Sequence, residues 1–458
     1  MSKIKKAWFC QNCGAESAKW LGRCPSCGEW NTFAEEIIST ARDSTGEATA
    51  ASKAVLIREI PARLQDRIFL NNRELERILG GGLVPGSVVL IGGEPGIGKS
   101  TLSLQIPLHS PHLRTLYVSG EESARQIKMR AERLASSQTG DSPQDNCLVL
   151  CETMLENILD QAREIQPSLL IIDSIQTVYS QRLDPSPGSV TQVRECAARL
   201  LKYAKETHIP VILVGHITKE GSIAGPKVLE HIVDVVLQFE GDNTHAYRIL
   251  RSIKNRYGST AELALFEMTQ KGLREVENPS EMLIPMHDEN LSGIAVAAML
   301  DGTRPFLIET QALVSTAAYG TPQRSATGFD TRRMNMLLAV LEKRAGFHLS
   351  AKDVFLNMAG GLRVADPAVD LAVASAVLSS AFDLAIPARW CFAAEVGLSG
   401  EIRPVPHLER RIAEADRLGF EKIFVSGYNA AAHIPKGTRI QVEKVTGMGP
   451  LSRKIFKI

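Results

Sequence analysis

A complete phosphate-binding loop is the segment of this sequence whose residue types point most directly to chemistry. The pattern G-x-x-x-x-G-K-[ST] runs from Gly93 to Ser100 and follows an apolar run that predicts a buried strand. Its glycines let backbone N–H groups converge on phosphate oxygens, Lys99 brings a cation to the β- and γ-phosphates, and Ser100 offers a hydroxyl to Mg²⁺. The residues expected to bind the nucleotide are Gly93, Glu94, Pro95, Gly96, Ile97, Gly98, Lys99, Ser100, Thr101 and Asp173.

Carboxylates at the ends of two further predicted strands complete the expected site. The run Leu169–Asp173 is apolar and ends in Asp173, which we expect to hold Mg²⁺ through water or through the loop serine. Glu121 and Glu122 follow the predicted strand Thr115–Ser119, and ligands of open α/β sheets bind at the carboxyl ends of strands. One of these two glutamates is the predicted general base for the attacking water, and the sequence leaves open which one.

Two more segments carry side chains suited to phosphate contacts. His216 and Thr218 follow an apolar strand and lie where a γ-phosphate sensor is expected, and Lys219 begins a Gly-rich loop. Lys254 and Arg256 lie two residues apart at a strand end, so both side chains point the same way and can reach one anion. In a ring of subunits that anion is a neighbour's γ-phosphate, but a DNA-contacting patch or a solvated turn fits the pair as well.

The cysteines predict a metal site near the N-terminus. Two CxxC pairs, each followed by glycine, are separated by ten residues, and this spacing lets four thiolates surround one tetrahedral ion. Zinc suits such a site in a reducing compartment, with two disulfides or a rubredoxin-like iron as the alternatives. The four expected ligands are Cys10, Cys13, Cys24 and Cys27.

Composition indicates a globular protein of several domains. The 458 residues are 44% hydrophobic and 22% charged, and the net charge of +1 restricts any nucleic-acid contact to local basic patches. We expect a cytoplasmic protein without a membrane partner, since no signal peptide and no bilayer-length apolar run is recognisable. Four parts are expected: a C4 zinc ribbon (1–34), a flexible linker of small polar residues (35–58), an α/β ATPase domain (59–280) and an α+β domain (281–458).

The elements that must position the site follow from hydrophobic patterning. Alternating strands and helices from Leu56 to Val276 predict a largely parallel sheet covered by helices on both faces, with three antiparallel strands added at one edge. The expected strands of this part are Ser87–Ile91, Thr115–Ser119, Leu148–Cys151, Leu169–Asp173, Val211–Gly215, Val233–Phe239, Tyr247–Ile253, Ala261–Met268 and Leu273–Val276. The C-terminal part predicts strands at Gly293–Leu300, Phe306–Val314 and Lys422–Val425 and helices at Asp330–Ala345, Pro367–Phe382 and His407–Leu418.

The order of these motifs resembles the bacterial RadA (Sms) family of DNA repair proteins over essentially the whole chain. The run Lys254-Asn-Arg-Tyr-Gly258 is the most specific element, with Tyr257 where the family usually has phenylalanine. The resemblance implies a core similar to the RecA and hexameric-helicase ATPases, with ATP at each interface of a hexameric ring and DNA in the central channel. It also implies that the loop from Lys219 to Lys227 faces DNA.

The implied activity is that of a DNA-dependent ATPase motor that translocates on DNA and promotes branch migration in recombinational repair. In this family ATP, Mg²⁺ and Zn²⁺ are the expected cofactors, and Lys254 and Arg256 act in trans or couple ATP to DNA. Single-stranded and branched DNA and the strand-exchange recombinase RecA are the expected partners. A RecA-type recombinase and a KaiC-like signalling ATPase, which shares the run Glu121-Glu-Ser123, are the alternatives.

The C-terminal part is similar to the proteolytic domain of Lon proteases. Alignment of the Lon motifs puts Ala368 at the serine nucleophile and Glu409 at the lysine base, so we expect no peptidase activity. The expected uses of this part are oligomerisation and DNA binding by a basic surface. The surface would consist of Arg324, Arg332, Arg333, Lys343, Arg344 and Arg363.

Overall fold

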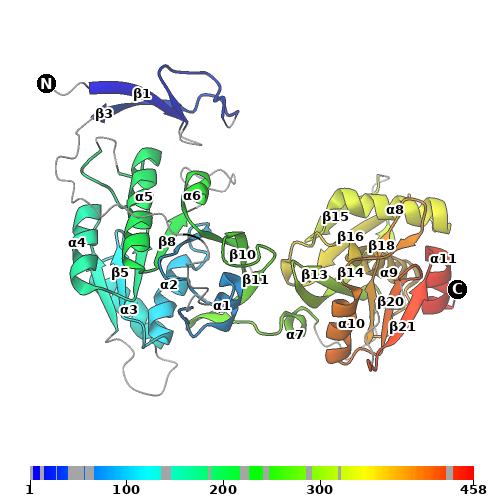
Figure 1. The fold of residues 1–458 in the computed structure, drawn as a ribbon. Helices are drawn as coiled ribbons and strands as arrows, with labels where there is room; N and C mark the ends of the chain where they lie inside the picture. The colour runs from blue at the N-terminus through cyan, green and yellow to red at the C-terminus, as the bar shows by residue number, and fades with distance from the viewer. Residues whose placement is uncertain are drawn as a thin grey trace. The chain divides into compact units, whose positions relative to one another are not determined.

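The computed structural model describes residues 4–10, 15–26, 28–39, 56, 67–135, 146–183, 187–216, 226–240, 247–284, 291–317, 321–429 and 437–457. The chain divides into two compact units, Met1–Val276 and Glu277–Ile458 (Figure 1). The second unit begins at Glu277 rather than at the expected residue 281, because helix α7 (Pro279–Leu283) packs against strand β14 (Arg304–Thr316) of that unit.

Three strands near the N-terminus form an antiparallel sheet in the order β2-β1-β3 within the described residues. β1 (Ile4–Cys10) pairs with β2 (Glu16–Ser17) on one side and with β3 (Phe33–Ser39) on the other. The linker expected from residue 35 therefore starts no earlier than residue 40, because residues 35–39 belong to β3.

The aromatic side chains of this small sheet are not all buried in its core. Phe33 is buried and Trp8 packs against it, but Trp20 and Trp30 are 49% and 67% exposed. Leu21 packs against the buried residues in their place. Hydrophobic character alone therefore does not decide burial in a sheet with so few residues.

A nine-stranded sheet, counted over the described residues, forms the centre of the first unit. Its strands lie in the order β12 (Gly272–Glu275), β11 (Leu263–Thr269), β10 (Tyr247–Asn255), β9 (Val235–Glu240), β4 (Val88–Gly93), β8 (Val211–His216), β7 (Leu169–Asp173), β5 (Thr115–Ser119) and β6 (Cys147–Cys151). The six strands from β9 to β6 run parallel, and β10, β11 and β12 are antiparallel additions. All nine predicted strands are confirmed, with ends that shift by no more than two residues.

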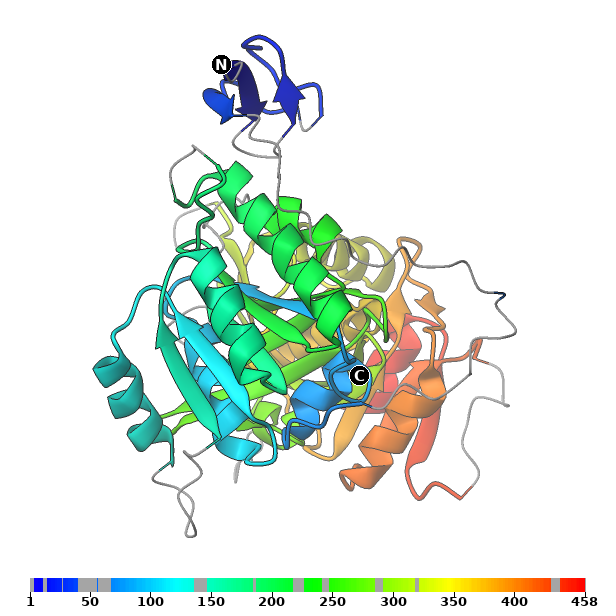
Figure 2. The same ribbon diagram turned by 60° about the vertical axis from the view of Figure 1, so that its left-hand side comes forward.

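Helices cover both faces of this sheet (Figures 1 and 2). Alternate strand residues point to opposite faces, so Val89 and Ile91 join one apolar cluster while Val88 and Leu90 join the other. The first cluster includes residues of α1 (Arg73–Leu79), α2 (Lys99–His109) and α3 (Ala124–Ala135). The second includes residues of α4 (Leu155–Ile165), α5 (Val190–Thr207) and α6 (Pro226–Ile232).

The second unit is built on a mixed sheet of seven strands within the described residues. The spatial order is β15 (Arg324–Thr327), β16 (Lys352–Met358), β14, β13 (Ile294–Asp301), β17 (Trp390–Ala393), β20 (Lys422–Ser426) and β21 (Gln441–Val445), with a separate pair β18 (Glu395–Val396) and β19 (Ile402–Arg403). Helices α8 (Thr331–Ala345), α9 (Asp370–Phe382) and α11 (Met448–Phe456) contribute to one apolar cluster, and α10 (Leu408–Arg417) contributes to another. None of the described helices in either unit has the length and apolar character needed to cross a membrane.

Candidate functional site

The phosphate loop connects the end of β4 to the start of α2 and requires glycine for two reasons. Gly96 and Gly98 have φ of 78° and 119°, a left-handed region that side chains other than glycine rarely adopt. A Cβ atom on Gly93 would lie 2.9 Å from Cβ of Phe239, and one on Gly98 would lie 2.9 Å from Cε of Met268. The loop backbone therefore fits closely against neighbouring strands at the N-terminal end of α2, where helix N–H groups favour an anion.

Lys99 lies inside this loop with only 3% of its surface exposed. Its Nζ donates hydrogen bonds to the carbonyl oxygens of Gly93 and Glu94, both at 2.9 Å. Burial lowers the pKa of Lys99 to about 8, while the nearby charges of Asp173 and Glu121 oppose the shift. The structure therefore brings the lysine and the two predicted acidic residues into one electrostatic environment.

Asp173 ends β7, which is separated from β4 by β8 alone. One carboxylate oxygen, Oδ2, accepts a hydrogen bond from the Tyr117 hydroxyl at 2.5 Å. The Gly120 N–H donates to the Asp173 carbonyl at 3.0 Å, and the peptide bond between Asp173 and Ser174 is cis. The two hydrogen bonds hold Asp173 at the carboxyl ends of the parallel strands, where the phosphate loop also lies.

The structure distinguishes Glu121 from Glu122. Glu121 Oε1 accepts a hydrogen bond from Ser174 Oγ at 2.7 Å and lies 3.4 Å from His216 Nε2. Glu122 instead pairs with Arg130 on α3. Glu121 is thus the glutamate that shares the edge of the sheet with Asp173, while Glu122 is occupied by an ion pair.

His216 ends β8 in register with Gly93 of β4, and its carbonyl oxygen accepts a weak hydrogen bond from Gln176 Nε2 at 3.5 Å. Its Nδ1 atom and Gln176 Oε1 are buried and have no hydrogen-bond partner among the described residues. Buried polar atoms without partners are uncommon and often mark a water or ligand site. Thr218 and Lys219, also expected near the phosphates, and most of the loop to Lys227 lie outside the described residues.

Lys254 and Arg256 lie at the opposite ends of the parallel strands from the phosphate loop. Lys254 Nζ donates to the carbonyl oxygens of Glu230 and Val233, and Arg256 Nη1 lies 3.9 Å from Asp234 Oδ1. Burial and then the nearby Arg256 lower the pKa of Lys254.

The contacts of Asp234 show that the parallel strands begin here. Its Oδ2 accepts a hydrogen bond at 3.0 Å from the N–H of Val88, the first residue of β4. Val88 begins β4 and Gly93 ends it, a separation of roughly 17 Å at about 3.3 Å per residue. The structure therefore does not bring the basic pair to the phosphate loop of its own chain.

Two of the four expected zinc ligands can be located. Cys10 and Cys24 are buried in the same small apolar cluster, and Cys10 Sγ lies 3.1 Å from Thr32 Oγ1. The Gly28 N–H donates to the Cys24 carbonyl at 2.9 Å, which is the tight turn expected after a CxxC pair. Cys13 and Cys27 lie outside the described residues, and the two described thiols share one buried cluster, as two ligands of one ion would.

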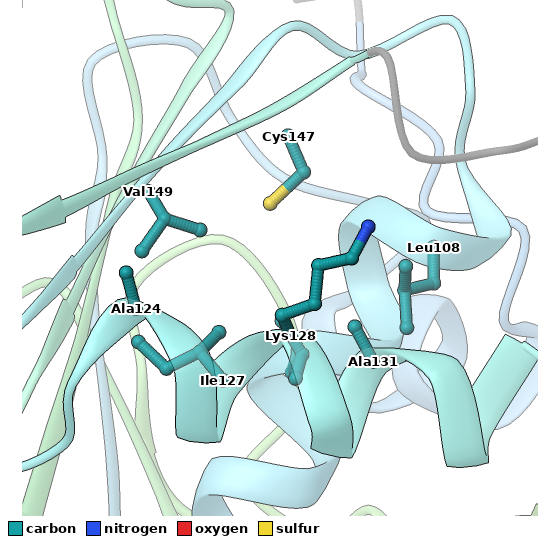
Figure 3. A pocket seen from close by; sticks show the side chains of 8 residues that line it. Leu108, Ala124, Ile127, Lys128, Ala131, Cys147 and Val149 are labelled. Carbon is teal, nitrogen blue, oxygen red and sulfur yellow. The ribbon is translucent and has the colours of Figure 1, made fainter.

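A pocket of about 420 Å³ lies away from these residues, between α2, α3 and the edge strand β6 (Figure 3). None of the predicted site residues lines it, and Lys128 is the one charged side chain among its lining residues. The others are Leu104, Leu108, Ala124, Ile127, Ala131, Cys147 and Val149.

In the second unit, Ala368 is fully buried and Glu409 is about half exposed. Arg333, expected on a DNA-binding surface, instead donates to both carboxylate oxygens of the buried Asp370. Its guanidinium is therefore held in a structural ion pair and is only partly exposed. The remaining members Arg332, Lys343, Arg344 and Arg363 are exposed and Arg324 is partly so.

Sequence reasoning missed three residues that organise these contacts: Tyr117, Ser174 and Asp234. Tyr117 lies in the middle of β5 and Ser174 directly follows β7, and neither had a partner in the sequence pattern. Their roles depend on β5 lying beside β7, which spacing along the chain does not specify.

Three protein families match parts of this chain. The AAA domain matches residues 59–222, a rubredoxin metal binding domain matches residues 8–35, and subunit ChlI of Mg-chelatase matches residues 310–429. Together with the sheet topology, these matches confirm the predicted fold class, a RecA-like P-loop ATPase core with a zinc ribbon before it and a Lon-protease-like domain after it.

Relatives match over nearly the full length. The DNA repair protein RadA of Listeria monocytogenes is 48% identical over 99% of each chain, and that of Bacillus subtilis is 46% identical over 96% of each. The RadB recombinase structure is similar with 20% identity and a TM-score of 0.38, covering 46% of this chain and all of that one. From its identity to full-length relatives, this chain belongs to the RadA family of DNA repair proteins.

Proposed function

We propose that this chain is a DNA-dependent ATPase motor that translocates on DNA and promotes branch migration of strand-exchange intermediates. The observation that carries this proposal is the convergence of Lys99, Asp173 and Glu121 at the edge of the sheet that holds the phosphate loop. Membership in a family of DNA repair proteins supports DNA as the partner.

In the proposed reaction, Lys99 exchanges its two loop carbonyl partners for the β- and γ-phosphates of ATP. Ser100 and Asp173 would hold Mg²⁺, which would neutralise charge on the phosphates. Glu121 orients the attacking water and accepts its proton, because Ser174 fixes one of its oxygens while half of the side chain stays exposed to an incoming ligand.

We infer that the ATP site is completed by residues of a second subunit, and that the subunits form a homo-oligomeric ring, a hexamer. Lys254 and Arg256 are too far from their own phosphate loop to contact its nucleotide, so their proposed role is in trans. Arg256, which is 59% exposed, is the better candidate for the arginine finger, and Lys254 would hold the end of α6 through two backbone carbonyls.

The remaining partners follow from the same proposal. Single-stranded and branched DNA would contact the segment after β8, the recombinase RecA would supply the strand-exchange intermediates, and the protein would act in the cytoplasm. A zinc ion held by the four N-terminal cysteines would stabilise the ribbon, which has too few buried residues to fold well without it.

The decisive experiment measures ATP hydrolysis by the full chain with no DNA, with single-stranded DNA and with a forked duplex. Hydrolysis that single-stranded or forked DNA stimulates, and that Lys99→Ala abolishes, is the expected result. A rate of ATP hydrolysis that neither DNA changes would favour a signalling ATPase. Strand exchange by the purified chain without RecA would favour a recombinase.

A further inference from the structure

Tyr117 donates a hydrogen bond to Asp173 at the candidate site, and the proposed reaction gives this contact no role. It lies in the middle of β5, is 1% exposed, and donates its hydroxyl hydrogen to Asp173 Oδ2 at 2.5 Å. In the register of β5 against β7, Tyr117 lies opposite Ile171, and Ser119 lies opposite Asp173. The tyrosine therefore reaches diagonally along one face of the sheet, a span that an aromatic side chain can bridge.

This hydroxyl can act on Asp173 only as a hydrogen-bond donor. An ionised carboxylate offers only acceptor oxygens, so the phenol is the partner in this pair that carries the hydrogen. A carboxylate that accepts such a bond at one oxygen is held in one orientation and keeps its other oxygen for a ligand. The ring itself packs in the apolar cluster on that face, so the phenol is anchored on both sides.

We propose that Tyr117 is a positioning residue for divalent metal: it holds Oδ2 of Asp173 so that Oδ1 faces the metal bound with the nucleotide. The proposal rests on the proposed ATPase function for the identity of the ligand. Its own content is that one phenol oxygen, which touches neither metal nor nucleotide, sets how tightly the metal binds. Outer partners of metal ligands typically change metal affinity by about 10- to 100-fold.

The test uses Tyr117→Phe in the full chain, which removes one oxygen and keeps the buried ring. Mn²⁺ replaces Mg²⁺ as a paramagnetic probe, and electron paramagnetic resonance measures its affinity for the protein in the presence of ATP. We expect the Mn²⁺ dissociation constant to rise about 10- to 100-fold. Nucleotide affinity in EDTA is expected to stay unchanged, and the Mg²⁺ concentration for half-maximal hydrolysis should shift by the same factor.

Tyr203→Phe is the matched control. Tyr203 is 3% exposed and donates to the Ala162 carbonyl at 3.4 Å, in the apolar cluster on the opposite face of the sheet. It loses a buried hydroxyl without touching Asp173, so its metal affinity should remain that of the native chain. Equal metal affinities for Tyr117→Phe and Tyr203→Phe would overturn the proposal.

The readouts separate this proposal from the proposed function. Mn²⁺ binding reports on Tyr117 even in a protein that does not hydrolyse ATP, whereas hydrolysis that survives Lys99→Ala would sink the ATPase assignment alone. Equal losses of metal affinity and of EDTA nucleotide affinity in Tyr117→Phe would show a general collapse of the site, which also contradicts a metal-specific role.

Discussion

Ser174 Oγ donates to Glu121 Oε1 at 2.7 Å, so the residue after the predicted metal ligand orients the predicted base. Neighbours in sequence thus serve the two halves of the proposed reaction. Asp173 would hold the metal, and Ser174 donates to the glutamate that is proposed to activate water. Glu122 is excluded from this arrangement by its ion pair with Arg130 on α3.

We therefore predict different outcomes for two matched variants, Glu121→Gln and Glu122→Gln. Glu121→Gln keeps the size of the side chain but removes its basicity, so hydrolysis should fall by about 10²- to 10⁴-fold while ATP still binds. Glu122→Gln weakens a partly exposed ion pair and should change the rate only a few-fold. Steady-state hydrolysis and nucleotide binding of both variants check this, and equal losses would contradict the assignment of the base.

A second prediction concerns pH and Lys99. Its pKa of about 8 in the nucleotide-free chain means that the phosphates bind a lysine that is charged below pH 8 and increasingly neutral above it. Phosphate favours the charged form, so ATP affinity should be full below pH 8 and should fall by about tenfold between pH 7 and pH 9, with proton uptake on binding.

Lys99→Arg is the control for this effect, because a guanidinium does not titrate in this range and its ATP affinity should vary less with pH. Titration calorimetry in buffers of different ionisation enthalpy measures both affinity and proton uptake. A native affinity that stays flat from pH 7 to pH 9 would contradict the role of lysine burial. Lys99→Ala should abolish turnover at every pH.

The buried elements of the first unit could be predicted because parallel strands covered on both faces appear in sequence as unbroken apolar runs. β4, β5 and β7 are of this kind. β16 was missed because the polar residues Asp353, which is buried, and Asn357, which is exposed, interrupt its apolar run. Strand boundaries followed from composition, but burial of single side chains such as Trp30 did not.

Part of the candidate site could likewise be predicted from the sequence, and part could not. The phosphate loop and its strand-end carboxylates follow motifs of fixed spacing, and they were predictable. The bonds from Tyr117 to Asp173 and from Ser174 to Glu121 join different strands and loops, so they depend on the spatial order of the sheet. The opposite placement of Arg256 had the same cause, since its distance from the phosphate loop is set by β9 and β10 pairing beside β4.

The proposed trans role of Arg256 predicts complementation between inactive subunits. Arg256→Ala leaves an intact phosphate loop and Lys99→Ala leaves an intact Arg256, so a mixed ring contains interfaces with both parts native. Hydrolysis should recover in mixtures although each variant alone is inactive. Rings shown by mass analysis to be mixed, but still inactive, would instead place Arg256 in a role within one subunit.

The N-terminal cysteines predict about one zinc per chain by elemental analysis. Cys10 and Cys24 already share one buried cluster, so Cys27→Ala should release the metal and unfold the ribbon alone. The first unit's ATPase fold and its basal hydrolysis should remain, while engagement of DNA or RecA is reduced. Absence of zinc, or two disulfides in its place, would contradict the metal assignment.

The last prediction concerns the second unit, which should hold the ring together and bind DNA without cleaving peptides. Acyl transfer needs an activated nucleophile with a base in reach, and the aligned positions carry a buried Ala368 and a carboxylate, Glu409. Deleting residues 277–458 should therefore weaken assembly and DNA affinity while the ATPase domain stays folded.

Alanine substitutions of single basic residues separate the proposed DNA-binding role of the second unit from its structural role. Lys343→Ala and Arg332→Ala each remove an exposed cation of α8. Each variant should bind all DNA sequences more weakly, and the slope of log binding constant against log salt concentration should fall by about one. Arg333→Ala leaves the buried Asp370 carboxylate without its guanidinium and should destabilise the unit instead. ATP-dependent cleavage of an unfolded protein, or a truncated chain with native rings and native DNA affinity, would refute this assignment of the second unit.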